Sequence, residues 1–258
     1  MNQNKKIDLI ILIIYPLIAG IFSYILKINM FFSVLIFFGI PSLYLTIKSR
    51  KIAKRAIIFS ILISFPFIII IDFIEHFTNQ WIVLSSILPK IFRYVTIEVI
   101  IWAIFNFYFV IMFYEYFVHN HFIKKTLNPR VKYLFLFSLF LFFIFLIFYT
   151  FAPHFLLVKY FYLRYGLVVI LIPIILQFIK YPKFIFKFTK VAIYFFYVSL
   201  VYEIMALKLN WWDFPGRDFI GWVSIYGFRF PLEEFIFWLL LFAMSILTFY
   251  EYFDNEEK

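Results

Sequence analysis

The chain has no cysteine, and it is poor in glycine, histidine and charged residues. Without cysteine it can form no disulfide bond, ligate no iron–sulfur cluster through thiolates and use no thiol nucleophile. Its four histidines are too few for a histidine-rich di-iron membrane enzyme. Glycine-rich phosphate loops, nucleotide fingerprints and Ser/His/Asp arrangements are absent as well. We therefore expect no metal centre and no cofactor.

What remains is strongly hydrophobic. Apolar residues make up 66% of the 258 residues, charged residues 15%, and the mean hydropathy is +0.98. Apolar runs of about 20 residues cross a bilayer as helices, and no strand-like alternation is present. The sequence predicts an all-α integral membrane protein with spans near 7–26, 30–47, 56–74, 98–117, 133–152, 160–179, 190–207 and 231–251. Pro41 and Pro173 interrupt the second and sixth spans.

The net charge of +10 comes from lysines and arginines concentrated in alternate connections. Examples are Lys48, Arg50 and Lys51 in one connection and Lys180, Lys183 and Lys187 in another. By the positive-inside rule, this pattern predicts a protein of the cell membrane with both termini in the cytoplasm. The basic clusters are expected to contact lipid headgroups, and no nucleic acid is expected as a partner.

Two stretches of the chain resemble each other. The segment 39–48 aligns with 171–180. Further along each half, the tetrad Tyr-Glu-Tyr-Phe occurs once, at 114–117 and at 250–253. Such internal similarity predicts a duplicated unit. Because each unit has four helices, the two copies would run parallel, as residues 1–125 and 126–258 of one membrane domain. Further paired positions are Asp72 with Glu203, Trp81 with Trp212, Glu98 with Glu234, and Trp102 with Trp238.

Acidic residues gather on the side that this topology makes non-cytoplasmic. Glu233 and Glu234 open the last apolar run, and an ionisable residue in such a place indicates function. Proline and acids at a helix start also have a capping role worth roughly 0.3–1 kcal/mol, which explains one acid. Capping does not explain the second acid of the Glu233-Glu234 pair, nor Glu98. These acids favour an apolar cavity lined by acids and aromatic rings. Glu115 and Glu251, at the other helix ends, are expected to be solvated or paired with lysine.

A metal site is the competing interpretation of one helix. Asp72, Glu75 and His76 have the i, i+3, i+4 spacing that places metal ligands on one helix face. The second unit offers only Glu203 in the matching region, with Leu207 opposite His76. We therefore disfavour a metal.

The second half of the chain has an acid at a helix end, a Trp-containing loop, the motif Pro231-Leu232-Glu233-Glu234-Phe235 and a final helix ending in Tyr-Glu. In these features it resembles the lycopene cyclase domain. This small membrane type occurs as two-subunit enzymes in bacteria and as fused enzymes in archaea and fungi. The resemblance is strongest over 194–253 and weaker over 63–117. It implies a cofactor-independent isomerase that converts lycopene to β-carotene through γ-carotene. A proton adds to the terminal double bond, the neighbouring alkene attacks the cation, and a second proton leaves.

The resemblance also implies which residues act. Glu233 and Glu234 would be proton donor and acceptor, in either order, with Glu98 as their counterpart in the first half. Asp72 and Glu203 would be the acids at the preceding helix ends. The substrate-binding residues would be Trp212, Trp238, Trp102, Phe235 and Pro231.

The first half departs from the family pattern, because Val95, Thr96 and Ile97 precede a single Glu98. This leaves open whether that half is catalytic and whether one or both lycopene ends are cyclised. The expected partners are a C40 carotenoid and the lipid bilayer, and association of identical chains is left open. The alternatives are another carotenoid end-group enzyme, a non-catalytic carotenoid-binding subunit, and a repeat-built transporter with acid pairs as its ion site.

Overall fold

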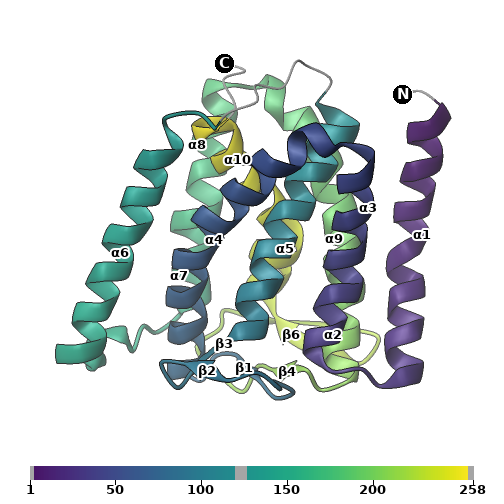
Figure 1. Cartoon of the computed structure of the whole chain (residues 1–258). Coiled ribbons are helices and arrows are strands. Elements are labelled where there is room, and N and C mark those ends of the chain that lie inside the picture. The colour runs from purple at the N-terminus through teal and green to yellow at the C-terminus, as the bar shows by residue number, and fades with distance from the viewer. Residues whose placement is uncertain (1–2, 120–126, 255–258) are drawn as a thin grey trace.

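The computed structural model describes residues 3–119 and 127–254. These residues form eight long apolar helices that are able to cross a membrane (Figure 1), which confirms the predicted all-α membrane class. The spans are α1 (Gln3–Leu26); α2 (Met30–Val34) with η1 (Leu35–Gly39) and α3 (Ile40–Lys48); α4 (Arg50–Phe77); α5 (Ile97–Phe113) with η2 (Tyr114–Val118); α6 (Val131–Phe151); α7 (Phe161–Tyr165) with η4 (Gly166–Leu171) and α8 (Ile172–Lys180); α9 (Lys183–Lys208); and η5 (Glu234–Leu241) with α10 (Phe242–Phe253). A short 3₁₀ turn, η3 (Pro153–Leu156), follows α6. The predicted boundary at 125/126 lies outside the described residues.

The two spans that contain Pro41 and Pro173 stay continuous. In each, a π-helical segment lies just before the proline, where Ile40 N–H donates to Leu35 O and Ile172 N–H donates to Leu167 O. Proline has no N–H to give to the helix ladder, and a wider π turn changes the pairing at that point without ending the helix. Both segments therefore remain long enough to cross a membrane.

Because the number of spans is even, Gln3 and Phe253 lie at one end of the bundle, called here the terminal end (Figure 1). The opposite end, called here the strand end, carries three short antiparallel pairs. β1 (Ile82–Val83) pairs with β4 (Trp212–Asp213), β2 (Lys90–Ile91) with β3 (Val95–Thr96), and β5 (Trp222–Ile225) with β6 (Phe228–Pro231). The β1–β4 pair ties the connection after α4 to the connection after α9.

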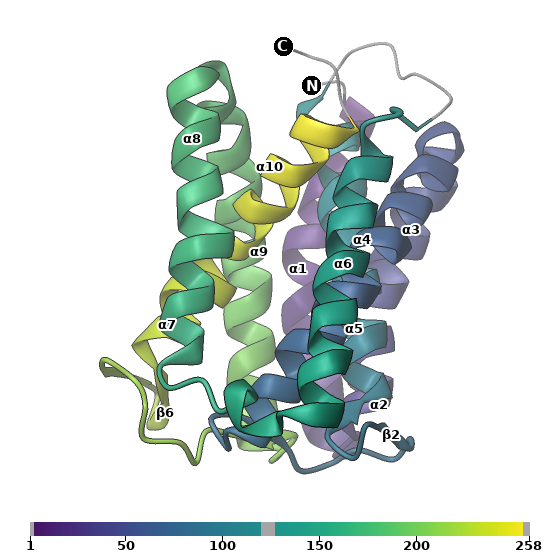
Figure 2. The ribbon, with the colours of Figure 1, turned by 90° about the vertical axis from the view of Figure 1, so that its left-hand side faces the viewer.

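The helices differ in how deeply they are buried. Burial is greatest in the span formed by α5 with η2 and in the span formed by η5 with α10, where 67% of the residues in the most apolar 18-residue stretch are buried. The corresponding share is 17% in α6 and 28% in α1. The outer helices present side chains such as Ile25 and Phe143 outward, as expected where acyl chains rather than water surround a bundle. Figure 2 shows α6 apart from α7 and α8, with α10 behind them.

Of the two alternatives expected for the acids of the two tetrads, solvation was wrong. Glu115 and Glu251 are buried, and each accepts a hydrogen bond from the tyrosine of the other tetrad. The Tyr250 hydroxyl lies 2.6 Å from Glu115 Oε1, and the Tyr114 hydroxyl donates to Glu251. A buried carboxylate needs donors, and the facing helix supplies them. The reciprocal bonds join η2 to α10 at the terminal end.

An ion pair closes the same end. Arg55 Nε lies 2.5 Å from Asp254 Oδ2, and both side chains are buried. Burial raises the pKa of the Asp254 carboxyl, and the Arg55 guanidinium opposes that rise. Asp254 Oδ1 also accepts the N–H of Asn128, so this carboxylate anchors the chain that enters α6.

We expect Tyr114→Phe and Tyr250→Phe each to lower the free energy of unfolding by roughly 1.5–3 kcal/mol, because each removes a donor from a buried acid. The measurement is the melting temperature of the detergent-solubilised protein. Tyr133→Phe, at a 60% exposed position on α6, is the matched control and should melt like the wild type. A melting temperature for Tyr250→Phe equal to that of the control would contradict the prediction.

Candidate functional site

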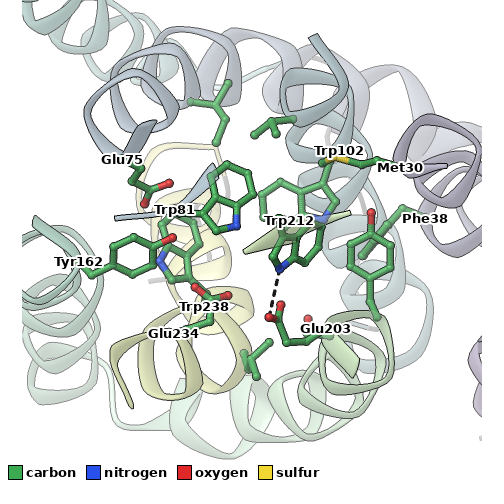
Figure 3. Close-up of a pocket in the computed structure, with 15 residues that line it drawn as sticks. Met30, Phe38, Glu75, Trp81, Trp102, Tyr162, Glu203, Trp212, Glu234 and Trp238 are labelled. Atoms are coloured by element: carbon green, nitrogen blue, oxygen red, sulfur yellow. Dashed lines mark hydrogen bonds between the residues drawn. The ribbon is translucent and has the colours of Figure 1, made fainter. Parts of the chain in front are cut away.

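A cavity of about 60 Å³ lies between the helices near the strand end (Figure 3). Three carboxylic side chains line it: Glu75 from the last turn of α4, Glu203 from the end of α9, and Glu234 from the start of η5. Three distant parts of the sequence therefore bring acids to one apolar space. Its aromatic lining consists of Phe38, Trp81, Trp102, Tyr162, Tyr202, Trp212 and Trp238.

The three acids lie within electrostatic range of one another. Glu234 interacts with both Glu203 and Glu75, and Figure 3 shows Tyr162 beside Glu75 on one side, with Glu203 across the cavity. Trp212 Nε1 donates to Glu203 Oε1 at 3.1 Å, whereas Glu75 Oε1 is buried with no hydrogen-bond partner among the described residues. No lysine, arginine or histidine is among the described lining residues. In such a site, a buried carboxylate can be neutralised by taking up a proton.

Indole rings form much of the wall. Trp81 and Trp212 lie 5.8 Å apart, and Trp238 is stacked on Tyr165 at 5.6 Å with an interplanar angle of 9°. Trp102 lies parallel to Phe242 on the other side. Aromatic faces attract cations, by roughly 0.5–2 kcal/mol each according to how dry the site is. The ring faces of the cavity can therefore stabilise a positive charge.

The β1–β4 pair closes the cavity on the strand side. His76 helps to fix it: its Nε2 accepts the Val83 N–H at 3.0 Å, and its Nδ1 lies 3.1 Å from Asp72 Oδ1. Asp72 Oδ2 in turn accepts the Thr96 N–H at 2.8 Å. Asp72 and His76 therefore hold the connection between α4 and α5, which positions Trp81. Neither of them lines the cavity.

Glu98 and Glu233 have a similar anchoring role. Glu98 accepts the backbone N–H groups of Ile87 and Leu88 and the hydroxyl of Ser86, at 2.7–3.0 Å. Glu233 Oε1 accepts the Ile220 N–H at 2.7 Å. Burial raises the pKa of the Glu233 carboxyl, and the Ile220 hydrogen bond partly offsets the rise. Each acid thus pins a strand-end loop to the start of the helix that follows it.

The structure therefore divides the predicted site residues. It brings Glu203, Glu234, Trp102, Trp212 and Trp238 to the cavity. Asp72, Glu98 and Glu233 hold loops at its border. Phe235 packs against Phe196 at 5.5 Å, and Pro231 is paired with Trp222 in β6; neither lines the cavity.

Sequence reasoning missed Glu75 and Tyr162 as parts of this site. Glu75 did carry a signal, because an acid in the last turn of an apolar helix is unusual, but its spacing from Asp72 and His76 pointed to a metal site. Within residues 3–119 and 127–254 no group of three or more His, Asp or Glu side chains could hold a metal ion. Tyr162 is one of 19 tyrosines and carried no signal of its own.

Comparison with protein-family models, with curated proteins and with solved structures finds no match for this chain. Its resemblance to the lycopene cyclase domain therefore remains a prediction. What the structure itself provides is a bundle of helices able to cross a membrane, with a cavity that is lined by acids and aromatic rings.

The raised pKa of Glu233 predicts a pH-dependent stability. Its stabilising contribution is present below the ordinary glutamate value of 4.5 and is lost as the pH rises through the raised pKa. We expect Glu233→Gln, which keeps an oxygen for the Ile220 N–H, to gain stability relative to the wild type between pH 4.5 and neutral pH. Melting temperatures of both proteins across this range provide the test. A constant difference between them would show that Glu233 does not titrate there.

Proposed function

We propose that this protein is a membrane enzyme that cyclises the acyclic ends of lycopene to β-ionone rings by adding and removing a proton. The observation that supports this function best is the cavity itself, where three carboxyl groups face aromatic walls inside an apolar bundle. Proton-driven ring closure needs an acid, a base and a dry environment for a carbocation. It needs no cofactor, and no atoms are gained or lost overall.

The acids can be given roles from their contacts. An indole N–H can only donate, so the Trp212 contact marks Glu203 Oε1 as an acceptor oxygen. We assign Glu203 as the carboxylate that removes the ring proton, and Glu234 as the acid that protonates the terminal alkene. Glu75 and Tyr162 lie on the side of Glu234 (Figure 3) and take part in its proton exchange. Transfer from Glu203 back to Glu234 then resets the site.

The walls serve the cation that exists between the two proton transfers. Trp81, Trp212 and Trp238 present ring surfaces to the cavity, and such faces stabilise positive charge without forming a bond to it. The cavity volume of about 60 Å³ holds only a few water-sized molecules, at about 10–15 Å³ each. A substrate end group needs more room, so aromatic side chains must move apart when it binds.

The duplication belongs to the same proposal. In the β1–β4 pair Ile82 lies opposite Asp213, which is its counterpart when Trp81 is aligned with Trp212. The reciprocal tyrosine–glutamate bonds likewise join matching residues. Contacts between counterparts are expected where a pseudo-two-fold axis relates two parallel repeats. The proposed axis runs along the bundle, with its strand end outside and its terminal end in the cytoplasm, where the basic connections lie.

The repeats would not be equivalent at the cavity. Glu98 and Glu233 share the loop-pinning role, so the next residues, Val99 and Glu234, are counterparts, and both line the cavity. The extra residue per turn in the π-helical η5 restores the match of Trp102 with Trp238. The second repeat thus supplies Glu203 and Glu234, and the first supplies Glu75. One such cavity closes one end group at a time.

The first test is to express the chain in a bacterium that accumulates lycopene and to separate the pigments by chromatography. We expect γ- or β-carotene from the wild type. Glu234→Gln and Glu203→Gln should each lower conversion by at least about 100-fold, the usual contribution of a positioned acid or base. Glu75→Gln should also lower it.

Asp213→Asn changes an exposed strand-end carboxyl outside the cavity and serves as the control, with conversion like the wild type. Membrane insertion of every variant is checked by its yield in the membrane fraction. Wild-type conversion by Glu234→Gln would rule out the assigned acid. Unchanged lycopene with inserted wild-type protein would count against the cyclase function as a whole.

A further inference from the structure

Three further cavities lie in a row along α7, η4 and α8. The first, of about 240 Å³, lies against α4 and α6; the second, of about 30 Å³, lies against α10; and the third, of about 350 Å³, lies between α8 and α10. Phe67, Tyr165 and Val169 line both the first and the second, and Phe249 lines both the second and the third. Together they form one feature, called here the lateral groove. Figure 2 faces it.

The lining of the lateral groove is that of a hydrocarbon site. The first cavity has only apolar and aromatic side chains. In the second and third, the hydroxyls of Ser245 and Thr248 are bonded to the backbone oxygens of Val169 and Met244. Two polar side chains of α8, Gln177 and Lys180, line the third cavity, and Lys180 lies at the terminal end of the row. A long chain without polar groups matches the surface of the first two cavities, where a polar or charged ligand would lose its hydration without gaining partners.

The groove is separated from the acid-lined cavity by a thin aromatic wall. Tyr165 lines the groove and is stacked on Trp238, which lines the acid cavity. Phe242 lines the second groove cavity and lies 4.9 Å from the same Trp238. Displacing one ring pair therefore joins the two spaces.

Gly166 makes this wall thin. A Cβ atom at that position would lie 2.1 Å from the ring of Phe237, so any side chain there would push η4 away from η5. Such a close approach requires glycine. It places Tyr165, the preceding residue, directly on Trp238, and it brings the groove to the border of the acid cavity.

We infer that the lateral groove holds the polyene chain of lycopene while one end of the molecule occupies the acid cavity; this rests on the proposed function. The groove extends from η3, near the strand end, towards the terminal end of α8 and α10. An extended C40 polyene is comparable in length to the ~30 Å hydrocarbon core that these helices cross. The groove thereby selects long linear substrates and admits them from the lipid phase. Since both ends cannot reach the acids together, the chain must leave and re-enter before the second ring is formed.

The test measures pigment binding separately from turnover. In the Glu234→Gln background, Ile144→Trp and Val169→Trp fill the groove, and the proteins are purified from a lycopene-accumulating bacterium. Lycopene retained per protein is read from the ratio of polyene to protein absorbance. We expect about a tenfold loss for each variant, which corresponds to about 1.4 kcal/mol of binding free energy. Ile147→Trp and Val168→Trp are the matched controls, because these side chains are 48% and 62% exposed to lipid.

The inference would be overturned if both groove variants retained as much lycopene as their controls. It would also be overturned if the groove variants lost only co-purifying phospholipid, because the groove would then be a lipid site. Two variants on different helices guard against misfolding, since melting temperatures identify a variant that fails to fold. The same substitutions in the wild-type background separate the two proposals. If the wild type cyclises lycopene and the groove variants do so equally well, only the groove assignment fails. If the wild type makes no cyclic product, the cyclase function fails, while retention still decides whether the groove binds the polyene.

Discussion

A carboxyl group that leaves water for the inside of an apolar bundle must find hydrogen-bond donors, a counter-ion or a proton, and this requirement shapes both ends of the protein. At the terminal end, Glu115 and Glu251 receive the hydroxyls of Tyr250 and Tyr114, and Asp254 receives Arg55. Those acids are fully committed to structure. Because each partner comes from a distant helix, the same bonds that satisfy the acids also fix how the helices are arranged.

At the strand end the same requirement is met in two different ways. Asp72, Glu98 and Glu233 accept backbone N–H groups from the connecting loops, so these acids hold those loops in place. Among the described residues no backbone N–H of a loop donates to Glu75 or Glu234, and Glu203 receives one indole N–H. The chemistry of the site follows from this difference, since only this second group of acids lines the cavity. The anchored acids still matter, because the loops that they hold carry the tryptophans of the wall.

Two similar arrangements border the cavity but bring different side chains to it. Glu234 follows the loop-pinning Glu233, just as Val99 follows Glu98, and both Glu234 and Val99 line the cavity. π-Helical turns are often found at functional sites, and here η5 begins at Glu234. The wall between the cavity and the apolar groove beside it depends on the close approach of η4 and η5 at Gly166.

Much of this could be predicted from the sequence. Long apolar runs determined eight membrane helices, because in lipid a chain must pair its backbone groups within itself. The scarcity of acids in those runs directed attention to Glu234, Glu203 and the tryptophans. The sequence could not separate Glu233 from Glu234, adjacent residues of which one pins a loop and the other lines the cavity, since this depends on how the strand-end loop packs against the start of the helix. Nor could it show that Glu75 faces a cavity, or that Glu115 and Glu251 find tyrosines on opposite helices. Those outcomes depend on which helices become neighbours, and only the packed bundle decides that.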